Sequence, residues 1–548
     1  MKNNENIFRN LQRSKVGIFS VITLICSPPY IAECFRIRAT KWQLIADPAL
    51  EVLGALDIGN HMRFLGVYSR FPWRHPGPAV YFFFAIPAKI GKDPAMSVAY
   101  WVIFFNLLLI ATTITILWKS VGRHAALILG SCLILVNVNG IEGVSSAWNP
   151  SIALPIFTLM LITAMFTSSS RYTLLWTSIL GSLVIQLHVG YAIPVFGILI
   201  LLLFIQINQS KNGATLFSMR TFLLTIGINF LLWSLPIWDQ IFGTGNFQKI
   251  IRDFAVEPKN VVGFHQALQI LAFHLRPRAP WNGATEIASF VSPQKVGSSW
   301  ILLPLVLVFF LAWVSVRHIP VLRAPVLTIL IGIIAAYISI ASLTGIAMPY
   351  MYVWLRILGS IFWGLLAYSA FLIILHSFPN YSRALFMGLV ALAAFTLSIS
   401  VRTTLNRSIP GEKAMNAVSY LTPFALELAP VGEQVGFVTS DFLSGIGDGL
   451  ILQYELHNRH IRMNPNAFLN SDAVASRLGR QRVGLDLASV EVSVVLGTSV
   501  RSFVANGFSV QTSYDLSKDR SNGREINNEG TEVVYLVSRR IQPVKVRD

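Results

Sequence analysis

The sequence predicts a polytopic α-helical membrane protein that ends in a soluble α+β domain, and three observations support this class. The chain of 548 residues is 54% hydrophobic and 13% charged, with a mean hydropathy of +0.59. Its apolar residues therefore exceed what one soluble core can bury. Apolar windows long enough to cross a bilayer recur along roughly the first 400 residues. After Val401 these windows stop, and short apolar runs separated by Gly, Asn and Asp follow.

The first apolar run, from Val16 to about Ile31, follows a basic N-terminal segment, Lys2 to Lys15. This arrangement is typical of a signal peptide or of a signal anchor. The small-residue cleavage pattern is poor, and Pro28-Pro29 interrupts the end of the run. We therefore predict an uncleaved anchor with a cytoplasmic N-terminus.

Ten more windows follow the first, which predicts about eleven transmembrane helices of roughly 20 residues each. The windows lie near residues 16–33, 96–118, 125–139, 150–167, 172–188, 190–207, 221–237, 299–316, 326–345, 352–375 and 384–401. The apolar piece Ala79 to Ile90 is too short for a span, and we predict an interfacial helix there.

The loops between the windows alternate in charge. The predicted inner loops carry basic residues and no acid, namely Lys119, Arg123, Arg171, Lys211, Arg220, Arg317, Arg323 and Arg383. This positive-inside pattern predicts a multi-pass protein of the cytoplasmic (inner) membrane. Much of the net charge of +17 then sets topology and contacts anionic membrane lipid, so nucleic acid is not an expected partner.

The predicted organisation has two domains. A transmembrane domain covers residues 1–401 and has long outer loops at 34–95 and 238–298. An extracytoplasmic α+β domain covers residues 402–548. Strand-length apolar runs in this second domain are Gln434 to Thr439, Val490 to Leu496 and Thr531 to Val537.

The segment Asp57 to Pro78, DIGNHMRFLGVYSRFPWRHPGP, is the best candidate for chemistry. It gathers ionisable residues beside the membrane, where they are costly and not needed for insertion. A carboxylate can take the proton of an attacking hydroxyl or amine, so Asp57 is the predicted catalytic base. The alternative is an N-cap or a loop salt bridge to Arg63.

The corner His75-Pro76-Gly77-Pro78 fixes the backbone and can start the interfacial helix at a set angle. His75 is a candidate substrate contact or part of the corner alone. Residues before it could stack on a sugar or neutralise a phosphate, with membrane anchoring as the alternative for the aromatic ones. These candidate substrate-binding residues are Tyr68, Arg70, Trp73 and Arg74.

Further polar residues stand near the predicted outer ends of later spans. Glu142 is either a second catalytic carboxylate or a solvated loop acid, and His188 is either a ligand contact or the cap of a helix. Arg356 lies about a turn inside the outer face, where a phosphate ligand or snorkelling explains it. Three more candidates follow the seventh window, namely Asp239, Gln240 and Asn246.

The sequence contains neither a metal-ligand spacing nor a nucleotide-binding motif. It has no HxxxH pair, no DxD in the outer loops, and no GxGxxG or Walker motif. We therefore expect a metal-independent reaction without a cofactor.

These residues, with AWNPS, QLHVGY and WDQIFGTGN downstream, resemble the GT-C superfamily of membrane glycosyltransferases. The resemblance is to the bacterial protein O-mannosyltransferase and aminoarabinose transferase type. The landmarks are an acid in the first outer loop, then His75-Pro76 opening a juxtamembrane helix that ends near Gly91, then a basic turn from Lys119 to Arg123. The resemblance covers roughly Val16 to Val401 and leaves the C-terminal domain unmatched. The chain has Gly77 where better-known families have a second proline.

The resemblance implies a sugar donor linked to polyprenyl phosphate, transfer on the outer face, and a first-loop acid as base. Asp57 would be that base and Glu142 a possible second carboxylate. Arg356, or the arginines near His75, would hold the phosphate leaving group. The implied activity is hexosyl or pentosyl transfer to a lipid, polysaccharide or protein of the bacterial cell envelope.

Two other functions compete with this hypothesis. A transporter or flippase of a lipid-linked saccharide would show inverted repeats or ionisable residues in mid-membrane helices, whereas the predicted spans are almost free of acids. A non-catalytic assembly subunit of the cell envelope would bind a partner through its C-terminal domain, and it would tolerate Asp57→Asn.

Overall fold

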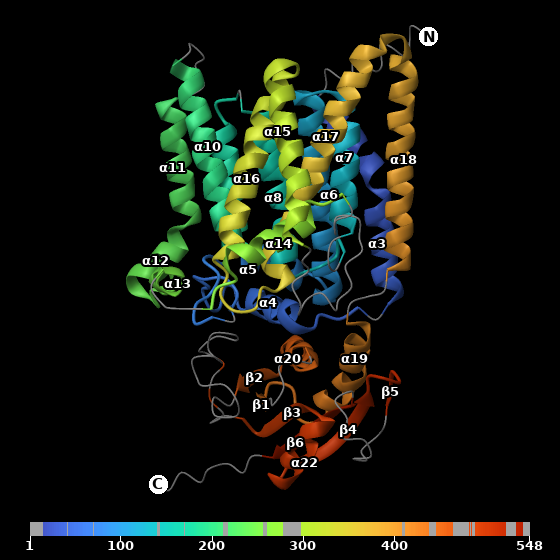
Figure 1. Ribbon diagram of the computed structural model, residues 1–548. Coiled ribbons are helices and arrows are strands. Elements are labelled where there is room, and N and C mark those ends of the chain that lie inside the picture. The colour runs from blue at the N-terminus through green and yellow to red at the C-terminus, as the bar shows by residue number, and fades with distance from the viewer. Residues whose placement is uncertain are drawn as a thin grey trace. The chain divides into compact units, whose positions relative to one another are not determined.

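The computed structural model combines many helices with one six-stranded sheet (Figure 1). It describes residues 15–40, 42–69, 71–139, 143–168, 170–211, 218–255, 260–277, 297–407, 411–437, 445–463, 482, 484, 488–521 and 533–540. The chain forms two compact units. The helical unit comprises Met1–Arg36, His75–Gly77 and Ala99–Arg407, and the mixed unit comprises Ile37–Arg74, Pro78–Val98 and Ser408–Asp548.

Each of the eleven predicted windows coincides with helical structure. The helices at the windows are α2 (Lys15–Cys26) with α3 (Pro28–Ala39), α6 (Pro94–Ser120), α7 (Arg123–Val138), α8 (Asn149–Phe166), α9 (Thr173–Leu187), α10 (Ala192–Lys211), α11 (Met219–Leu232), α15 (Leu302–Arg317), α16 (Arg323–Ala341), α17 (Leu355–Ser377) and α18 (Ser382–Asn406). Shorter helices are α5 (Ala79–Ile90), α12 (Ser234–Phe242), α13 (Asn246–Ala255) and α14 (Gly263–Leu275), with 3-10 turns that include η1 (Val189–Tyr191) and η6 (Pro349–Tyr352).

The lengths and composition of the helices bear on the predicted number of spans. Among the described residues, six helices are long and apolar enough to cross a membrane, or eight if each of two bent pairs is one span. The predicted count of about eleven is not confirmed, because α7, α9 and α15 have only 16, 15 and 16 residues. At about 1.5 Å per residue they reach roughly 24 Å, against a hydrocarbon core of about 30 Å.

The two bent pairs are α2 with α3, at 48°, and α11 with α12, at 58°. The first bend falls at Pro28-Pro29, the residues that interrupt the first apolar window. Proline has no backbone N–H and cannot continue the hydrogen bonds of the preceding turn.

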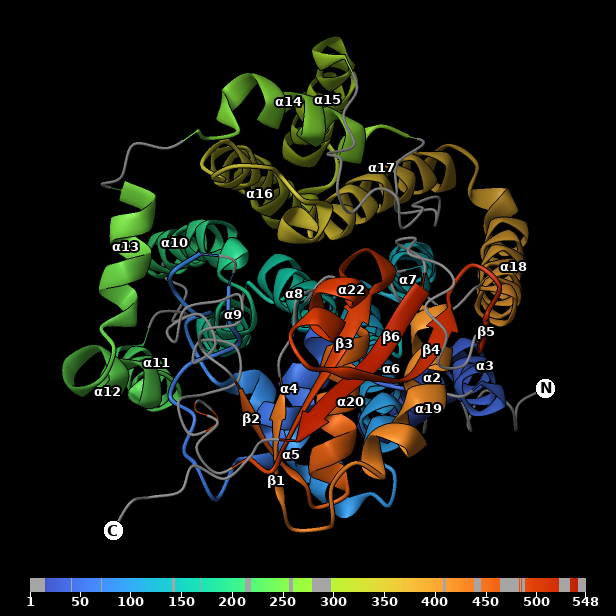
Figure 2. The same cartoon turned by 90° about the horizontal axis from the view of Figure 1, so that it is seen from below.

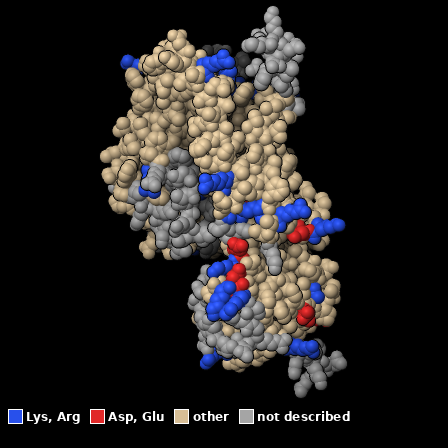
Figure 3. Space-filling model, turned by 90° about the vertical axis from the view of Figure 1, so that its right-hand side faces the viewer, with Lys and Arg blue, Asp and Glu red and all other residues tan. Residues whose placement is uncertain are grey.

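The outer surface of the helical unit is apolar. Most of it on the face in Figure 3 is formed by residues other than Lys, Arg, Asp and Glu. Across the helical unit, large side chains such as Phe204, Leu231, Phe309 and Phe395 are more than 60% exposed. Such a surface, over helices of this length, is typical of contact with lipid. The chain is therefore a multi-pass membrane protein.

The mixed unit contains the sheet, whose strand order is β2-β1-β3-β6-β4-β5 (Figure 2). The strands are β1 (Gln434–Phe437), β2 (His460–Met463), β3 (Val490–Leu496), β4 (Ser509–Asp515), β5 (Arg520–Ser521) and β6 (Val533–Arg540). Strand β1 pairs in parallel with β2 and β3, and the other pairs are antiparallel. The predicted run Val490 to Leu496 coincides with β3, and its buried residues continue on both faces.

Helices α19 (Glu412–Leu426), α20 (Ile446–Leu456) and α22 (Gly497–Ala505) pack against the sheet. Val500 of α22 belongs to a buried cluster with Val495, Tyr535 and Val537. The first outer loop joins the same unit, because its helix α4 (Ala46–Leu56) packs on α20. The C-terminal region and the first outer loop thus belong to one compact unit.

Candidate active site

Helix α4 carries an acid at each end, with Asp47 in its first turn and Asp57 as its C-cap residue. An acid is favourable at the N-terminal end of the helix dipole and unfavourable at the C-terminal end. Asp57 is also 7% exposed, so its charge needs local compensation. The carboxylates at the two ends of α4 therefore have different environments.

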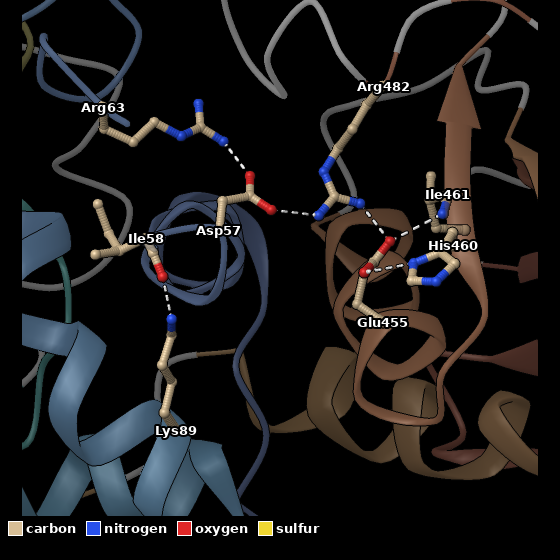
Figure 4. A network of polar contacts seen from close by, with 8 residues as sticks. All are labelled: Asp57, Ile58, Arg63, Lys89, Glu455, His460, Ile461 and Arg482. Carbon is tan, nitrogen blue, oxygen red and sulfur yellow. Dashed lines mark hydrogen bonds and ion pairs between the residues drawn. The ribbon is translucent and has the colours of Figure 1, made fainter. Parts of the chain in front are cut away.

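Two guanidinium groups compensate Asp57 (Figure 4). Arg63 donates to its Oδ2, and Arg482 donates to its Oδ1 at 2.8 Å. The other arm of Arg482 donates to Glu455, which also accepts the backbone N–H of Ile461 at 2.9 Å. The salt bridge to Arg63 that the sequence leaves open as the alternative role of Asp57 is therefore present.

This network is strongly held. Burial lowers the pKa of Arg482, but the charges of Glu455 and Asp57 and their hydrogen bonds raise this pKa above its ordinary value. Each oxygen of Asp57 accepts a charge-assisted hydrogen bond, so this carboxylate links Arg63 to Arg482. The structure thus places Asp57 in a buried ion-pair network, and its predicted role as base stays a prediction.

Asp47 lies in a more open place. It is half-buried and accepts the hydroxyl proton of Tyr68, a predicted site residue. The residue before it, Ala46, has a φ of +51°, a left-handed conformation that is uncommon for residues other than glycine. The N–H of Ala46 donates to the carbonyl of Gly445 at 3.1 Å. Such strain, fixed by a neighbouring segment, is found most often at functional sites.

The other predicted residues of the first loop have different surroundings. Tyr68 and Arg74 pair through an isolated β-bridge, and Arg74 is half-buried. Trp73 is 3% exposed and stacks on Phe71, with ring centroids 5.3 Å apart, so packing accounts for it. Arg70 lies outside the described residues.

In the helical unit, His75 and His188 come together, with ring centroids 4.7 Å apart. Both are buried. The backbone N–H of Val189 donates to Nδ1 of His75 and that of Gly190 donates to Nδ1 of His188, each at 3.2 Å. A neutral ring whose Nδ1 accepts carries its proton on Nε2. Both side chains are therefore fixed as neutral donors, and neither supplies a cation for a phosphate.

Two aromatic side chains that the sequence did not single out lie beside this pair. Tyr350 packs edge-on against His188, at 6.3 Å between centroids, and Trp148 lies 5.1 Å from Tyr350. Both are partly exposed. The motifs HPGP, AWNPS and QLHVGY, which are far apart in the sequence, thus converge with η6 at one place.

The burial of His75 makes stability depend on pH. Burial, and secondarily the nearby His188, hold the pKa of His75 well below its ordinary value of 6.5. The unfolded chain then binds this proton at a higher pH than the folded chain, so the contribution is complete above pH 6.5 and is lost as the pH falls. We expect a loss of up to about 1.4 kcal/mol per pH unit for one such group. Thermal unfolding between about pH 7.5 and about pH 5 should therefore show a smaller decline for His75→Gln than for the wild type, and an equal decline would contradict this account.

Steric crowding by Gln186 favours glycine at position 77. A Cβ atom at this position would lie 2.4 Å from Cγ and Oε1 of Gln186, whose amide donates to the carbonyl of Leu232 at 2.8 Å. Any side chain at position 77 would displace Gln186, which explains why the chain lacks the second proline of the better-known families here.

Replacing Gly77 by Ala should destabilise the protein by about 1–3 kcal/mol, because the added methyl group overpacks the contact with Gln186. The midpoint of thermal unfolding measures this loss. Gly227→Ala is the matched control, since a Cβ there meets nothing within 4 Å. Equal midpoints for the two variants would show that Gln186 moves aside without cost.

Arg356 lies in a buried cluster of arginines at the end of α7. It is 4% exposed, so it does not snorkel to water, and its Nη1 donates to the carbonyl of Asn139 at 3.3 Å. Arg407 donates to the preceding carbonyl, that of Val138, at 2.5 Å. The two guanidinium groups therefore sit side by side at consecutive carbonyls.

Glu33 and Arg36 of α3 complete what we call the arginine cluster, namely Glu33, Arg36, Arg356 and Arg407. Arg36 binds Glu33 through two hydrogen bonds of 2.7 Å, and Ser145 also donates to Glu33. A Cβ atom on Gly143 would lie 2.3 Å from Arg407 and 3.4 Å from Glu33. Glu142, the predicted second carboxylate, immediately precedes Gly143 in the chain and lies outside the described residues.

The polar residues after α11 organise a turn. Asp239 accepts the N–H and the hydroxyl of Thr244 at 3.1 and 2.9 Å, and the N–H of Asn246 at 3.3 Å. Gln240 accepts the N–H of Gln248 at 3.1 Å. These bonds join α12 to α13, so they give the three predicted residues a local structural role.

No protein-family model matches the sequence, and no curated protein sequence matches it. Solved structures do match. ArnT from Cupriavidus metallidurans, bound to undecaprenyl phosphate, aligns over 95% of this chain and 97% of its own, with a TM-score of 0.56 and 12% identity. This chain therefore has the fold of ArnT. ArnT in the apo state gives a TM-score of 0.53 at 13% identity over the same shares. The GT-C resemblance is thus confirmed for the fold, and it extends into the C-terminal region that the sequence left unmatched.

Proposed function

We propose that this chain is a glycosyltransferase that moves a sugar from a polyprenyl-phosphate-linked donor to an acceptor on the outer face of the bacterial cytoplasmic membrane. The observation that carries the proposal is the alignment over nearly the whole chain with ArnT, whose structure holds undecaprenyl phosphate. The proposal keeps the N-terminus in the cytoplasm and the C-terminal region outside, and it includes no metal or cofactor.

The reaction needs a base and a cationic binding site for the leaving group. The bond between the anomeric carbon and the phosphate oxygen breaks, and its electron pair leaves with the phosphate. The acceptor oxygen or nitrogen bonds to the same carbon, and its proton passes to a carboxylate. Positive charge develops on the sugar and negative charge on the phosphate, so fixed cations near the phosphate stabilise the transition state.

The arginine cluster supplies such cations. Its described members are three guanidinium groups and one carboxylate, drawn from α3, α17 and the end of α18. Ionisable groups inside a membrane protein are costly to place there and tend to be functional. The planar fork of arginine suits a phosphate, so we assign Arg356, with Arg36 and Arg407, to the leaving group. Arg74, near His75, is the alternative residue to bind the phosphate leaving group.

We assign the base to Asp47 of α4 in place of Asp57. Asp47 is half-buried and accepts from a neutral phenol, whereas Asp57 is buried between two guanidinium groups. A half-buried carboxylate that accepts from a neutral phenol is suited to take the proton of an attacking hydroxyl or amine. Glu142 remains a proposed second carboxylate that orients the acceptor.

Transfer of label from polyprenyl-phosphate sugars tests the function in membranes that contain the protein, with membranes that lack it as control. We expect label to leave the donor lipid and to enter a lipid, polysaccharide or protein fraction. A panel of hexosyl and pentosyl donors covers the sugar. Label that crosses the bilayer while still on the donor lipid would indicate a flippase. Label that stays on the donor lipid and on its original side of the bilayer, with every donor tested, would contradict both the transferase and the flippase.

A further inference from the structure

The C-terminal region holds the start of α4 against α20. Residues 43–46 lie along α20, where Gln453 donates to Oε1 of Gln43 at 2.9 Å and Ala46 donates to Gly445 at 3.1 Å. Gly449 makes this approach possible, because a Cβ there would lie 3.0 Å from the carbonyl oxygen of Leu44. The strained backbone before Asp47 is thus shaped by a segment some 400 residues away.

The same region also holds the end of α4. Arg482 lies between Asp57 of α4 and Glu455 in the last turn of α20, and it donates one arm to each carboxylate (Figure 4). The side chains of these three residues are only 8–11% exposed. A lysine has a single ammonium group in place of the planar fork, so it cannot reproduce this bridge.

We propose that Arg482 is a positioning residue, which together with α20 fixes the helix that carries the catalytic base Asp47. The C-terminal region is then a working part of the catalytic centre. This inference rests on the proposed function. Its physical basis is that a misplacement of about 1 Å in a reacting group can cost about 100-fold in rate.

The experiment compares Arg482→Gln and Arg482→Lys with the control Arg539→Gln. Arg539 also pairs with a buried carboxylate, Glu491, but this pair joins β3 to β6. The control therefore removes a similar ion pair from the same unit without touching α4.

Two readouts are measured on the full-length protein. The first is amide hydrogen exchange, where Arg482→Gln should accelerate exchange in α4 by about 10-fold or more while β3 and β6 stay protected. The second is transfer kinetics, expressed per molecule that binds donor so that misfolded protein does not count. We expect kcat to fall about 10- to 100-fold with a much smaller change in KM, an intermediate kcat for Arg482→Lys, and little change for Arg539→Gln.

The outcomes separate this inference from the proposed function. Unchanged exchange in α4, or faster exchange with unchanged kcat, would overturn the positioning role. Absence of transfer by the wild type would overturn the proposed function, while the exchange readout would still decide whether Arg482 holds α4. If Arg482→Gln also accelerates hydrogen exchange in β3 and β6, the variant Glu455→Gln is used in its place. Glu455→Gln keeps the bond between Arg482 and Asp57. That variant should show a smaller effect of the same kind, and no effect would overturn the proposal.

Discussion

Replacing Asp47 by Asn should abolish most sugar transfer while the protein still folds and reaches the membrane. Asparagine keeps the shape of the side chain and can still accept the hydroxyl proton of Tyr68, but it cannot take the proton of the acceptor. Loss of a general base costs about 10²- to 10⁴-fold in rate. The measurement is kcat for transfer from a polyprenyl-phosphate sugar, with the protein level determined in the same membranes.

The control for this variant is Asp93→Asn, which changes an exposed acid of the same unit. Asp93 accepts the backbone N–H of Met96 at the start of α6, so its loss should leave the rate nearly unchanged. Normal activity of Asp47→Asn, together with an inactive but folded Asp57→Asn, would return the role of base to Asp57.

Replacing Asp57 by Asn should instead destabilise the protein. The substitution removes one charge from a buried network and leaves Arg63 and Arg482 without their shared carboxylate. Breaking a buried ion pair from one side costs about 3–5 kcal/mol. We therefore expect a lower midpoint of thermal unfolding and less protein in the membrane.

A wild-type midpoint for Asp57→Asn would show that the ion pairs do not stabilise the fold. The fraction that still folds should retain more activity per molecule than Asp47→Asn. Rates per folded molecule and unfolding midpoints thus distinguish a chemical role of Asp47 from a structural role of Asp57.

The sequence was informative where structure follows from local hydropathy. Each apolar window lies on a helix and the run Val490 to Leu496 forms β3, because burial sets the periodicity and length of apolar runs. The number of complete spans was less predictable. Window hydropathy does not give the length of a helix, and α7, α9 and α15 have only 16, 15 and 16 residues.

The site was only partly predictable because its contacts are not local. Arg63 was a foreseeable partner of Asp57, but the second guanidinium group comes from Arg482, 425 residues later, and no local pattern joins them. His75 and His188 were named separately, and only the fold makes them neighbours. Glu33 and Arg36 were a missed signal, since an acid and an arginine three residues apart on one helix face form a visible pair.

The central claim is that the chain breaks the bond between a sugar and polyprenyl phosphate. The most direct test is to incubate the purified full-length protein with a panel of polyprenyl-phosphate sugars and candidate acceptors, and to measure the free polyprenyl phosphate released. We predict acceptor-dependent release by the wild type, and release at least about 100-fold slower by Asp47→Asn. Equal release by both proteins, or donors that stay intact with every acceptor, would contradict the account.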